Sequence, residues 1–281
     1  MSAKTRASGY PAPVAAPAPA PLRTLALVED NACEGGANHR LALRVPGWPG
    51  FLPGHFAMLS PGAVGAAPRS DPLLPRPMAV YRAAGERVEV LYKRTGRGTA
   101  LLAEARPGER VRLVGPLGQP FPLPAPGERA LLVGGGTGIA SLHELARRLA
   151  GGDVAVLLGA RSAADLLGRA DFEALGVPLQ LATEDGSAGL RGLATELLER
   201  ELERGGPARV YACGPTPMMR RAADIAAARG AAAVASLENQ MACGYGVCLG
   251  CAVPLREGGY ALVCRDGPVL AADAVAWEGL A

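Results

Sequence analysis

The chain has 281 residues, a formal net charge of +3 and 49% hydrophobic residues. This length and apolar content suit two packed domains with a small third module. The small charge, without a run of Lys and Arg, excludes the usual electrostatic footprint of a nucleic-acid-binding protein. No apolar window is long enough to span a bilayer, and no signal peptide is recognisable, so the sequence predicts no membrane association and a cytoplasmic location. In that compartment the six cysteines are better explained as metal ligands and buried thiols than as disulfides.

The N-terminal half begins with a Pro/Ala-rich tract over residues 1–22, for which we expect an extended tail. Over residues 23–126, short β-favouring runs are broken by Gly and Pro, a pattern typical of an antiparallel β-barrel or sandwich. The runs cover residues 25–30, 39–45, 86–93 and 109–115.

Strands and helices alternate over residues 127–232. Strands are expected at 130–136, 153–160, 177–184 and 208–214, and helices at 139–150, 163–176, 190–204 and 216–230. The first helix carries apolar residues at i, i+3 and i+4, as Ile139, Leu142 and Leu145 show. Consecutive βα units predict a parallel sheet covered on both faces, so the fold class is α/β plus β.

The remaining segment, 233–281, loses this rhythm and holds four cysteines in the pattern C-x4-C-x2-C-x12-C, namely Cys243, Cys248, Cys251 and Cys264. This is the plant-type spacing of [2Fe-2S] ligands. A zinc site usually shows two C-x2-C pairs, where this chain has one, and a disulfide pair would suit a secreted domain. We therefore predict an iron–sulfur domain.

Three loops of the α/β region follow predicted strands and are rich in turn-forming residues. The carboxyl ends of parallel strands are where such sheets bind ligands, and a glycine loop opening a helix suits a pyrophosphate. An acid there would favour the ribose 2′-hydroxyl of NAD over the 2′-phosphate of NADP. The candidate nucleotide-binding residues are Gly134, Gly135, Gly136, Thr137, Gly138, Glu184, Asp185, Cys213, Gly214 and Pro215.

The N-terminal half carries a second candidate site, in which an arginine and a glycine loop could neutralise another pyrophosphate. Its residues are Arg76, Pro77, Met78, Ala79, Leu91, Tyr92, Lys93, Gly98 and Thr99.

The order of these motifs resembles the electron-transfer subunit of class 1B, NAD-dependent dihydroorotate dehydrogenase, within the ferredoxin-NADP reductase superfamily. The resemblance covers residues 25–270 and rests on RPMAVY, LYKRTGRGT, LLVGGGTGIASLHELA, CGP and above all the cysteine loop with CRDGPV. It implies FAD on the barrel, NAD on the α/β domain, a [2Fe-2S] cluster bound by the four cysteines, and an FMN-containing catalytic subunit as partner in a heterotetramer. One departure is Ala79, where the family commonly carries serine.

The predicted function is therefore electron transfer from the FMN of a dihydroorotate dehydrogenase catalytic subunit, through [2Fe-2S] and FAD, to NAD in pyrimidine biosynthesis. No catalytic acid–base residue is predicted, because cofactors carry the chemistry. One alternative is an NADH-linked FAD and [2Fe-2S] subunit of a hydrogenase, a sulfide-reducing complex or a ferredoxin reductase. Another is a redox sensor that binds the cluster and the nucleotide without turnover.

Overall fold

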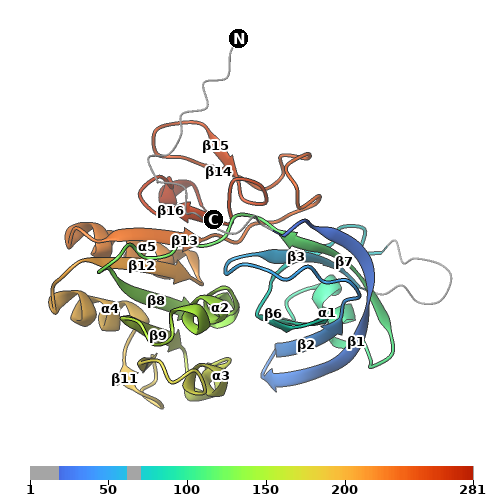
Figure 1. The fold of residues 1–281 in the computed structure, drawn as a ribbon, viewed down its shortest axis with the longest axis horizontal. Helices are drawn as coiled ribbons and strands as arrows, with labels where there is room; N and C mark the ends of the chain where they lie inside the picture. The colour runs from blue at the N-terminus through green and yellow to red at the C-terminus, as the bar shows by residue number, and fades with distance from the viewer. Residues whose placement is uncertain (1–18, 62–70, 281) are drawn as a thin grey trace, which may run out of the picture.

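The computed structural model describes residues 19–61 and 71–280, arranged as two lobes with a third segment lying across them (Figure 1). The expected Pro/Ala tail lies mostly outside the described residues. None of the helices in the described ranges is long and apolar enough to cross a membrane.

The first lobe is a strongly curled antiparallel sheet of seven strands. In spatial order the strands are β4 (Arg76–Ala79), β3 (Phe56–Ser60), β7 (Arg110–Leu117), β1 (Leu22–Gly35), β2 (Asn38–Arg44), β6 (Arg87–Lys93) and β5 (Arg82–Ala84). The edge strands β4 and β5 are not paired with each other in this sheet, so the expected barrel is an open half-barrel in the described residues. A short helix, α1 (Arg97–Ala103), follows β6 where a loop was expected.

The second lobe is the expected parallel sheet, in the order β11, β10, β9, β8, β12, β13, with β16 added antiparallel at one edge. Its strands are β8 (Arg129–Gly135), β9 (Val154–Ala160), β10 (Leu179–Thr183), β11 (Leu190–Arg191), β12 (Ala208–Cys213), β13 (Ala232–Ser236) and β16 (Val269–Ala271). The helices are α2 (Ile139–Leu149), α3 (Arg169–Glu173), α4 (Ala194–Glu203) and α5 (Thr216–Ala228), with 3-10 turns η1 (Gly136–Gly138) and η2 (Ala163–Asp165).

The helix expected over residues 163–176 is broken. Gly168 adopts a left-handed conformation with φ of 61°, and this separates η2 from α3. A left-handed residue cannot continue a right-handed helix, and glycine accepts it without the strain of a Cβ. The expected domain boundary at residue 232 falls at the start of β13, which belongs to the parallel sheet.

The C-terminal segment has little secondary structure beyond the hairpin β14 (Ala252–Pro254) and β15 (Tyr260–Leu262) and the 3-10 turn η3 (Trp277–Gly279). Its apolar side chains, such as Val253 and Trp277, join the core that lies between the parallel sheet, α4 and α5. The same core reaches Met58 and Leu117 of the curled sheet. The segment therefore depends on both lobes for its burial.

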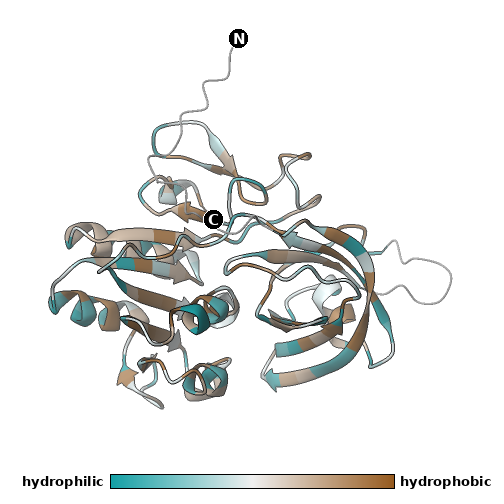
Figure 2. Ribbon diagram, viewed as in Figure 1, coloured by the Kyte–Doolittle hydropathy of each residue, from teal (hydrophilic) through white to brown (hydrophobic). Residues whose placement is uncertain are grey.

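Hydrophobic residues concentrate on the parallel strands, and polar residues on the outer faces of the helices (Figure 2). A separate core fills the concave side of the curled sheet, where Leu41, Leu43 and Leu113 are fully buried.

Substitution of Leu157 in β9 tests the core between the parallel sheet and helices α4 and α5, because its side chain is fully buried there. Replacement by alanine should lower the free energy of unfolding by about 2–5 kcal/mol, as deletion of buried methyl groups does. The matched control is Leu123→Ala, at a leucine that is 56% exposed, which should change it by less than about 0.5 kcal/mol. Urea denaturation would measure both, and equal effects would contradict the assigned core.

Candidate functional site

The loops that follow β8 and β12 meet at the point where the strand order of the parallel sheet reverses. From β8 the chain proceeds outward to β9 and β10, whereas β12 and β13 lie on the other side. Such a switch point leaves a crevice at the carboxyl ends of the strands. The two loops touch there, because a Cβ on Gly138 would lie 2.5 Å from the backbone nitrogen of Gly214.

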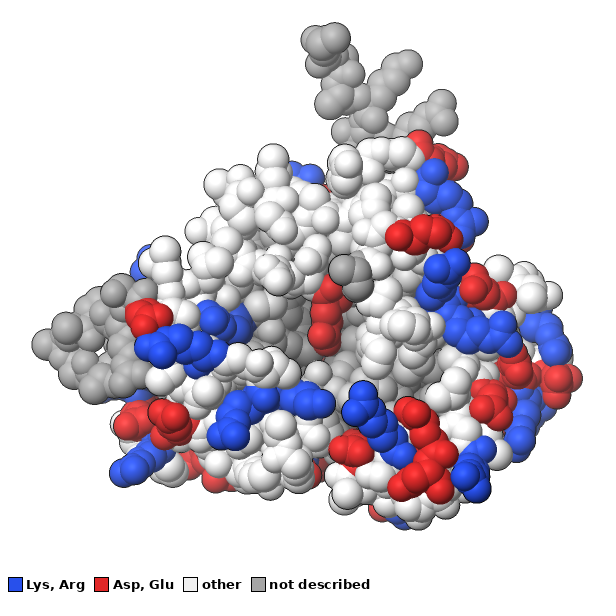
Figure 3. Space-filling model, turned by 180° about the vertical axis from the view of Figure 1, so that it is seen from behind, with Lys and Arg blue, Asp and Glu red and all other residues white. Residues whose placement is uncertain are grey.

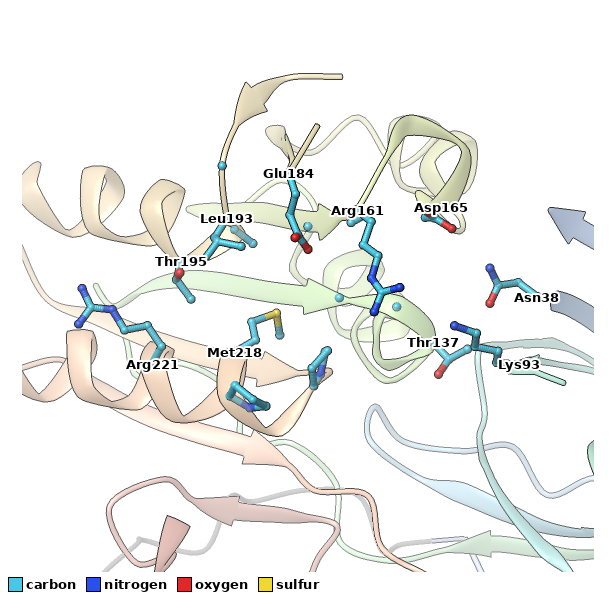
Figure 4. Close-up of a pocket in the computed structure, with 18 residues that line it drawn as sticks. Asn38, Lys93, Thr137, Arg161, Asp165, Glu184, Leu193, Thr195, Met218 and Arg221 are labelled. Atoms are coloured by element: carbon cyan, nitrogen blue, oxygen red, sulfur yellow. The ribbon is translucent and has the colours of Figure 1, made fainter. Parts of the chain in front are cut away.

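A cavity of about 560 Å³ opens at this edge, and loops following four parallel strands line it (Figure 4). They contribute Thr137 after β8, Arg161 after β9, Glu184 after β10 and Pro215 after β12. The expected convergence of the three strand-end loops is thus observed in the geometry, and β9 adds a fourth.

The curled sheet supplies the opposite wall. Asn38 and Lys93, which are register partners at the ends of β2 and β6, both line the cavity. Figure 4 shows their side chains facing the end of the cavity toward which Arg161 extends. The cations Lys93 and Arg161 lie near the glycine loop after β8, and this combination suits an anionic group such as a pyrophosphate.

Several predicted nucleotide-binding residues have structural roles instead of facing this cavity. Gly134 packs against α2, and Gly138 and Gly214 provide the close approach of the two loops. Asp185 accepts hydrogen bonds from the backbone N–H of Ser187 at 2.9 Å and from its hydroxyl at 2.6 Å, and these bonds lower the pKa of its exposed carboxyl. Of the two candidate acids, Glu184 lines the cavity, whereas Asp185 is not part of its lining.

Cys213 is fully buried and donates its thiol proton to the carbonyl oxygen of Ser236 at 3.5 Å. Burial raises the pKa of the thiol to about 12, and the nearby carboxyl of Glu238 contributes a smaller effect in the same direction. This environment suits a structural thiol.

A second cavity, of about 570 Å³, lies between the two lobes and contains most of the predicted flavin motif. The predicted residues that line it are Arg76, Pro77, Met78, Ala79, Leu91, Tyr92, Lys93 and Thr99. Gly98 lies beneath the guanidinium of Arg76, since a Cβ there would overlap that group. A side chain at position 98 would therefore displace the Arg76 guanidinium from this place in the cavity.

Thr99 has a second role in this loop. Its hydroxyl accepts hydrogen bonds from the backbone N–H groups of Thr95 and Gly96 at 3.0 and 3.1 Å, and it donates to the Gly96 carbonyl oxygen at 3.0 Å. These bonds hold the turn before α1.

The two cavities adjoin, because Lys93 and Thr137 line both. An elongated flavin nucleotide needs an apolar wall and a cation for its pyrophosphate, which Leu91, Tyr92 and Arg76 provide. The residues present fit FAD in the second cavity and a dinucleotide in the first.

Sequence reasoning missed the run Glu238–Met241, which lines the second cavity together with Ser141 and Ser236. This run directly follows β13, the last parallel strand, and its place at a strand end could have predicted its role. Glu238 lines the cavity as a solvent-accessible residue, and desolvation by the protein around it raises the pKa of its carboxyl. Figure 3 shows the face where the lobes meet along a hollow, with largely uncharged walls and an acidic side chain within it.

The four predicted cluster ligands lie as two pairs. The sulfur atoms of Cys251 and Cys264 are 3.2 Å apart and form no disulfide, and Cys243 forms a hydrogen bond with Cys248. Within residues 19–61 and 71–280 no three Cys, His, Asp or Glu side chains are already gathered around one metal position. Two pairs of thiols match a group with two metal ions better than a single four-coordinate ion.

Backbone N–H groups point at these sulfur atoms. Burial opposes ionisation of Cys243, but hydrogen bonds from the backbone of Cys248, Tyr245 and Val247 lower the pKa of its thiol to about 6. The N–H of Gly246 donates to the Cys264 sulfur at 3.1 Å. A loop that presents donors to thiolates suits an iron–sulfur cluster, whose sulfur atoms accept such bonds.

Cys248→Ser tests the cluster assignment, because it breaks one thiol pair. The variant should lose iron, labile sulfide and the visible absorption of a [2Fe-2S] group. Cys33→Ser is the matched control at a cysteine outside the loop, and it should keep all three. Metal and sulfide analysis would check both, and wild-type protein that contains zinc without sulfide would overturn the assignment.

Comparisons with known proteins agree with this arrangement. Residues 238–276 match the family model described as the iron-sulfur cluster binding domain of dihydroorotate dehydrogenase B, and residues 132–224 match the oxidoreductase NAD-binding domain. The electron transfer subunit of dihydroorotate dehydrogenase B (NAD(+)) from Geobacillus thermodenitrificans is 41% identical over 231 residues, covering 79% of this chain and 86% of that protein.

A homolog of the same subunit from Aquifex aeolicus is 38% identical over 253 residues, covering 88% of this chain and 96% of its own length. Among solved structures, one described as an NADH-dependent reduced ferredoxin-NADP oxidoreductase superposes with a TM-score of 0.79 at 25% identity, covering 91% of both chains. The cytochrome b5 reductase domain of Ulva prolifera nitrate reductase superposes with a TM-score of 0.59 at 16% identity, covering 74% of this chain and 93% of that one, and shares the fold.

Proposed function

The chain belongs to the electron-transfer subunits of dihydroorotate dehydrogenase B, and on this premise we propose that it carries electrons from the FMN of a catalytic subunit, through [2Fe-2S] and FAD, to NAD. When bound, the cluster supplies one-electron transfer, and the flavin supplies the exchange between single electrons and a hydride. The protein's own residues then position the groups and exclude competing reactions.

The cofactor-holding residues follow from the cavities. Arg76–Ala79, Leu91–Lys93 and Thr99 would hold FAD, with Gly98 seating Arg76. Cys243, Cys248 and Cys251 of the loop, together with Cys264 after β15, would hold the cluster, and the backbone donors around Cys243 and Cys264 would orient it. Ala79 offers no hydroxyl to the flavin, so a polar contact at that point would come from backbone.

The position of the cysteine loop is the observation that carries this proposal. Met241 lines the flavin cavity two residues before Cys243. Gly244 packs against Met58 and Leu117 of the curled sheet, where a Cβ would lie 2.6 Å from the Met58 side chain. At the other end of the loop Cys248 is exposed. The loop therefore extends from the wall of the flavin cavity to the surface.

The first cavity would bind NAD. Arg161 and Lys93 provide positive charge for the pyrophosphate, and Glu184 follows β10, where an acid favours a ribose 2′-hydroxyl and repels a 2′-phosphate. This arrangement favours NAD over NADP.

Exposed apolar side chains lie on the cysteine loop and on the hairpin that follows it, and this group, which we call the apolar collar, suits the catalytic partner. Tyr245, Val247 and Leu249 are 58, 73 and 62% exposed, and Tyr260 of the neighbouring hairpin is 73% exposed. Exposed apolar groups gathered around a redox site indicate a protein interface. We place the FMN subunit here, in a heterotetramer of two catalytic and two electron-transfer subunits. The proposed compartment is the cytoplasm, which keeps the cluster thiols reduced.

Anaerobic addition of NADH to the purified chain, loaded with FAD and cluster, tests the proposal. Both the flavin and the [2Fe-2S] absorption bands should bleach, and NADH should support the reduction of an artificial acceptor. NADPH is the control and should act much more weakly, because of Glu184. Loaded protein that NADH cannot reduce would refute the proposed electron transfer.

Tyr260→Glu tests the partner surface at a collar residue that lies outside the cysteine loop. A charge placed in the collar should weaken association with the FMN subunit at least about tenfold, because an unpaired charge is costly to bury at an interface. The dihydroorotate-to-NAD reaction should fall at limiting subunit concentration, while NADH oxidation by the isolated chain is unchanged. Leu123→Glu, at a leucine that is 56% exposed and lies outside the collar, is the control. Sedimentation of the mixed subunits would report association, and equal binding by both variants would exclude this surface.

A further inference from the structure

We propose that Asp171 is a positioning residue: its carboxylate joins the two lobes and sets the separation of the two walls of the NAD cavity. The inference rests on the proposed binding of NAD to that cavity. Asp171 lies on α3 in the second lobe, and three donors from the curled-sheet lobe converge on it.

The contacts are short and involve both oxygen atoms of the carboxylate. Oδ2 of Asp171 accepts from Nη2 of Arg40 at 2.6 Å and from the hydroxyl of Tyr81 at 2.8 Å, and Oδ1 accepts from Nη1 of Arg82 at 2.7 Å. The side chain of Asp171 is 19% exposed and that of Arg40 is 15% exposed. Partial burial strengthens these charge-assisted hydrogen bonds relative to those of an open surface pair.

The donors are held in place within the curled sheet. Arg40 also binds Glu34 at 2.6 Å, and Arg82 also binds Glu89 at 2.6 Å. Both guanidinium groups lie over the ring of Tyr81, at 5.3 and 5.7 Å from its centre. The curled sheet thus presents preorganised donors to the carboxylate on α3. We call the group of Asp171, Arg40, Tyr81 and Arg82 the Asp171 latch.

Tyr81 extends the latch into the apolar contact between the lobes. Its ring is fully buried and lies 4.7 Å from the ring of His143 on α2, measured between centroids. Burial, together with Asp171, raises the pKa of the Tyr81 hydroxyl, so the phenol keeps its proton and donates. The latch therefore joins α2 and α3 to one edge of the curled sheet.

The latch and the cavity share the same two strands. β2 carries Arg40 and, two residues earlier, Asn38, while β6 carries Glu89 and ends at Lys93. Asn38 and Lys93 form the wall that the curled sheet contributes to the NAD cavity. On the opposite side, η2 places Asp165 in the same cavity, six residues before Asp171. A change in the latch must therefore alter the separation of the cavity walls.

Removal of the carboxylate would leave Arg40 and Arg82 close together without their shared anion, although Glu34 and Glu89 would still hold each of them on the curled sheet. The curled sheet would keep its fold, and the contact across the lobes would be the part that loosens. A further bond between the lobes, from Arg148 on α2 to the carbonyl oxygen of Phe51 at 3.0 Å, would keep them associated. The expected result is a wider range of lobe orientations, of which fewer are competent to bind the dinucleotide.

The test compares Asp171→Ala and Asp171→Asn with Glu173→Gln in the full chain loaded with FAD and cluster. Glu173 is the matched control, because its carboxylate lies on the same helix and pairs with Arg169 within that helix. Calorimetric titration with NAD⁺ should give a Kd about tenfold higher for Asp171→Ala and a smaller increase for Asp171→Asn. FAD and iron content should match the wild type, KM for NADH should rise more than kcat falls, and Glu173→Gln should leave all values unchanged.

Hydrogen–deuterium exchange supplies a readout that is independent of the nucleotide. Asp171→Ala should exchange faster at the ends of β2 and β6 and at residues 136–138, on both walls of the cavity. Unchanged exchange there, with unchanged Kd for NAD⁺, would overturn the proposal even if the melting temperature fell. If wild-type protein does not bind NAD⁺, the proposed function fails, and the exchange experiment still decides whether Asp171 sets the position of the two walls.

Discussion

The architecture depends on a close approach of the cysteine loop to the curled sheet. Gly244 rests on Met58 and Leu117, and Gly118 lies directly against Pro268, where a Cβ would come within 2.5 Å of its ring. A side chain at either glycine would push the C-terminal segment away from the first lobe. These contacts hold the cysteine loop beside the cavity assigned to the flavin, which Met241 lines two residues before Cys243.

The protein therefore performs redox work chiefly through placement. In the proposed function, the parallel sheet would supply loops for one nucleotide and the curled sheet would supply Arg76 and an apolar wall for another. Both lobes together bury the segment that carries the cysteines. Each of the two cavities takes residues from both lobes. Neither cavity would be complete in an isolated lobe, so the orientation of the lobes is a functional quantity in this fold.

Local patterns were predictable from the sequence, and contacts between distant segments were not. The cysteine spacing and the alternation of strands and helices are local, so the loop at Cys243 and the order β8, α2, β9 were predicted. The broken helix at Gly168 was missed because apolar spacing on both sides masks a single left-handed residue. Asn38 was missed because its place in the cavity depends on the pairing of β2 with β6. Arg40, Tyr81 and Asp171 meet only when the lobes pack, and no motif marks them.

The strand β16 couples the cysteine-containing segment to the nucleotide-binding lobe. It pairs antiparallel with β13 and so forms the outer edge of the described parallel sheet, although it lies beyond all four cysteines in the chain. Cys264 is therefore held between a hairpin on one side and a strand docked on the nucleotide-binding lobe on the other. The thiols therefore occupy these places only while β16 is docked on β13, so the shape of the metal-binding site depends on the integrity of the parallel sheet.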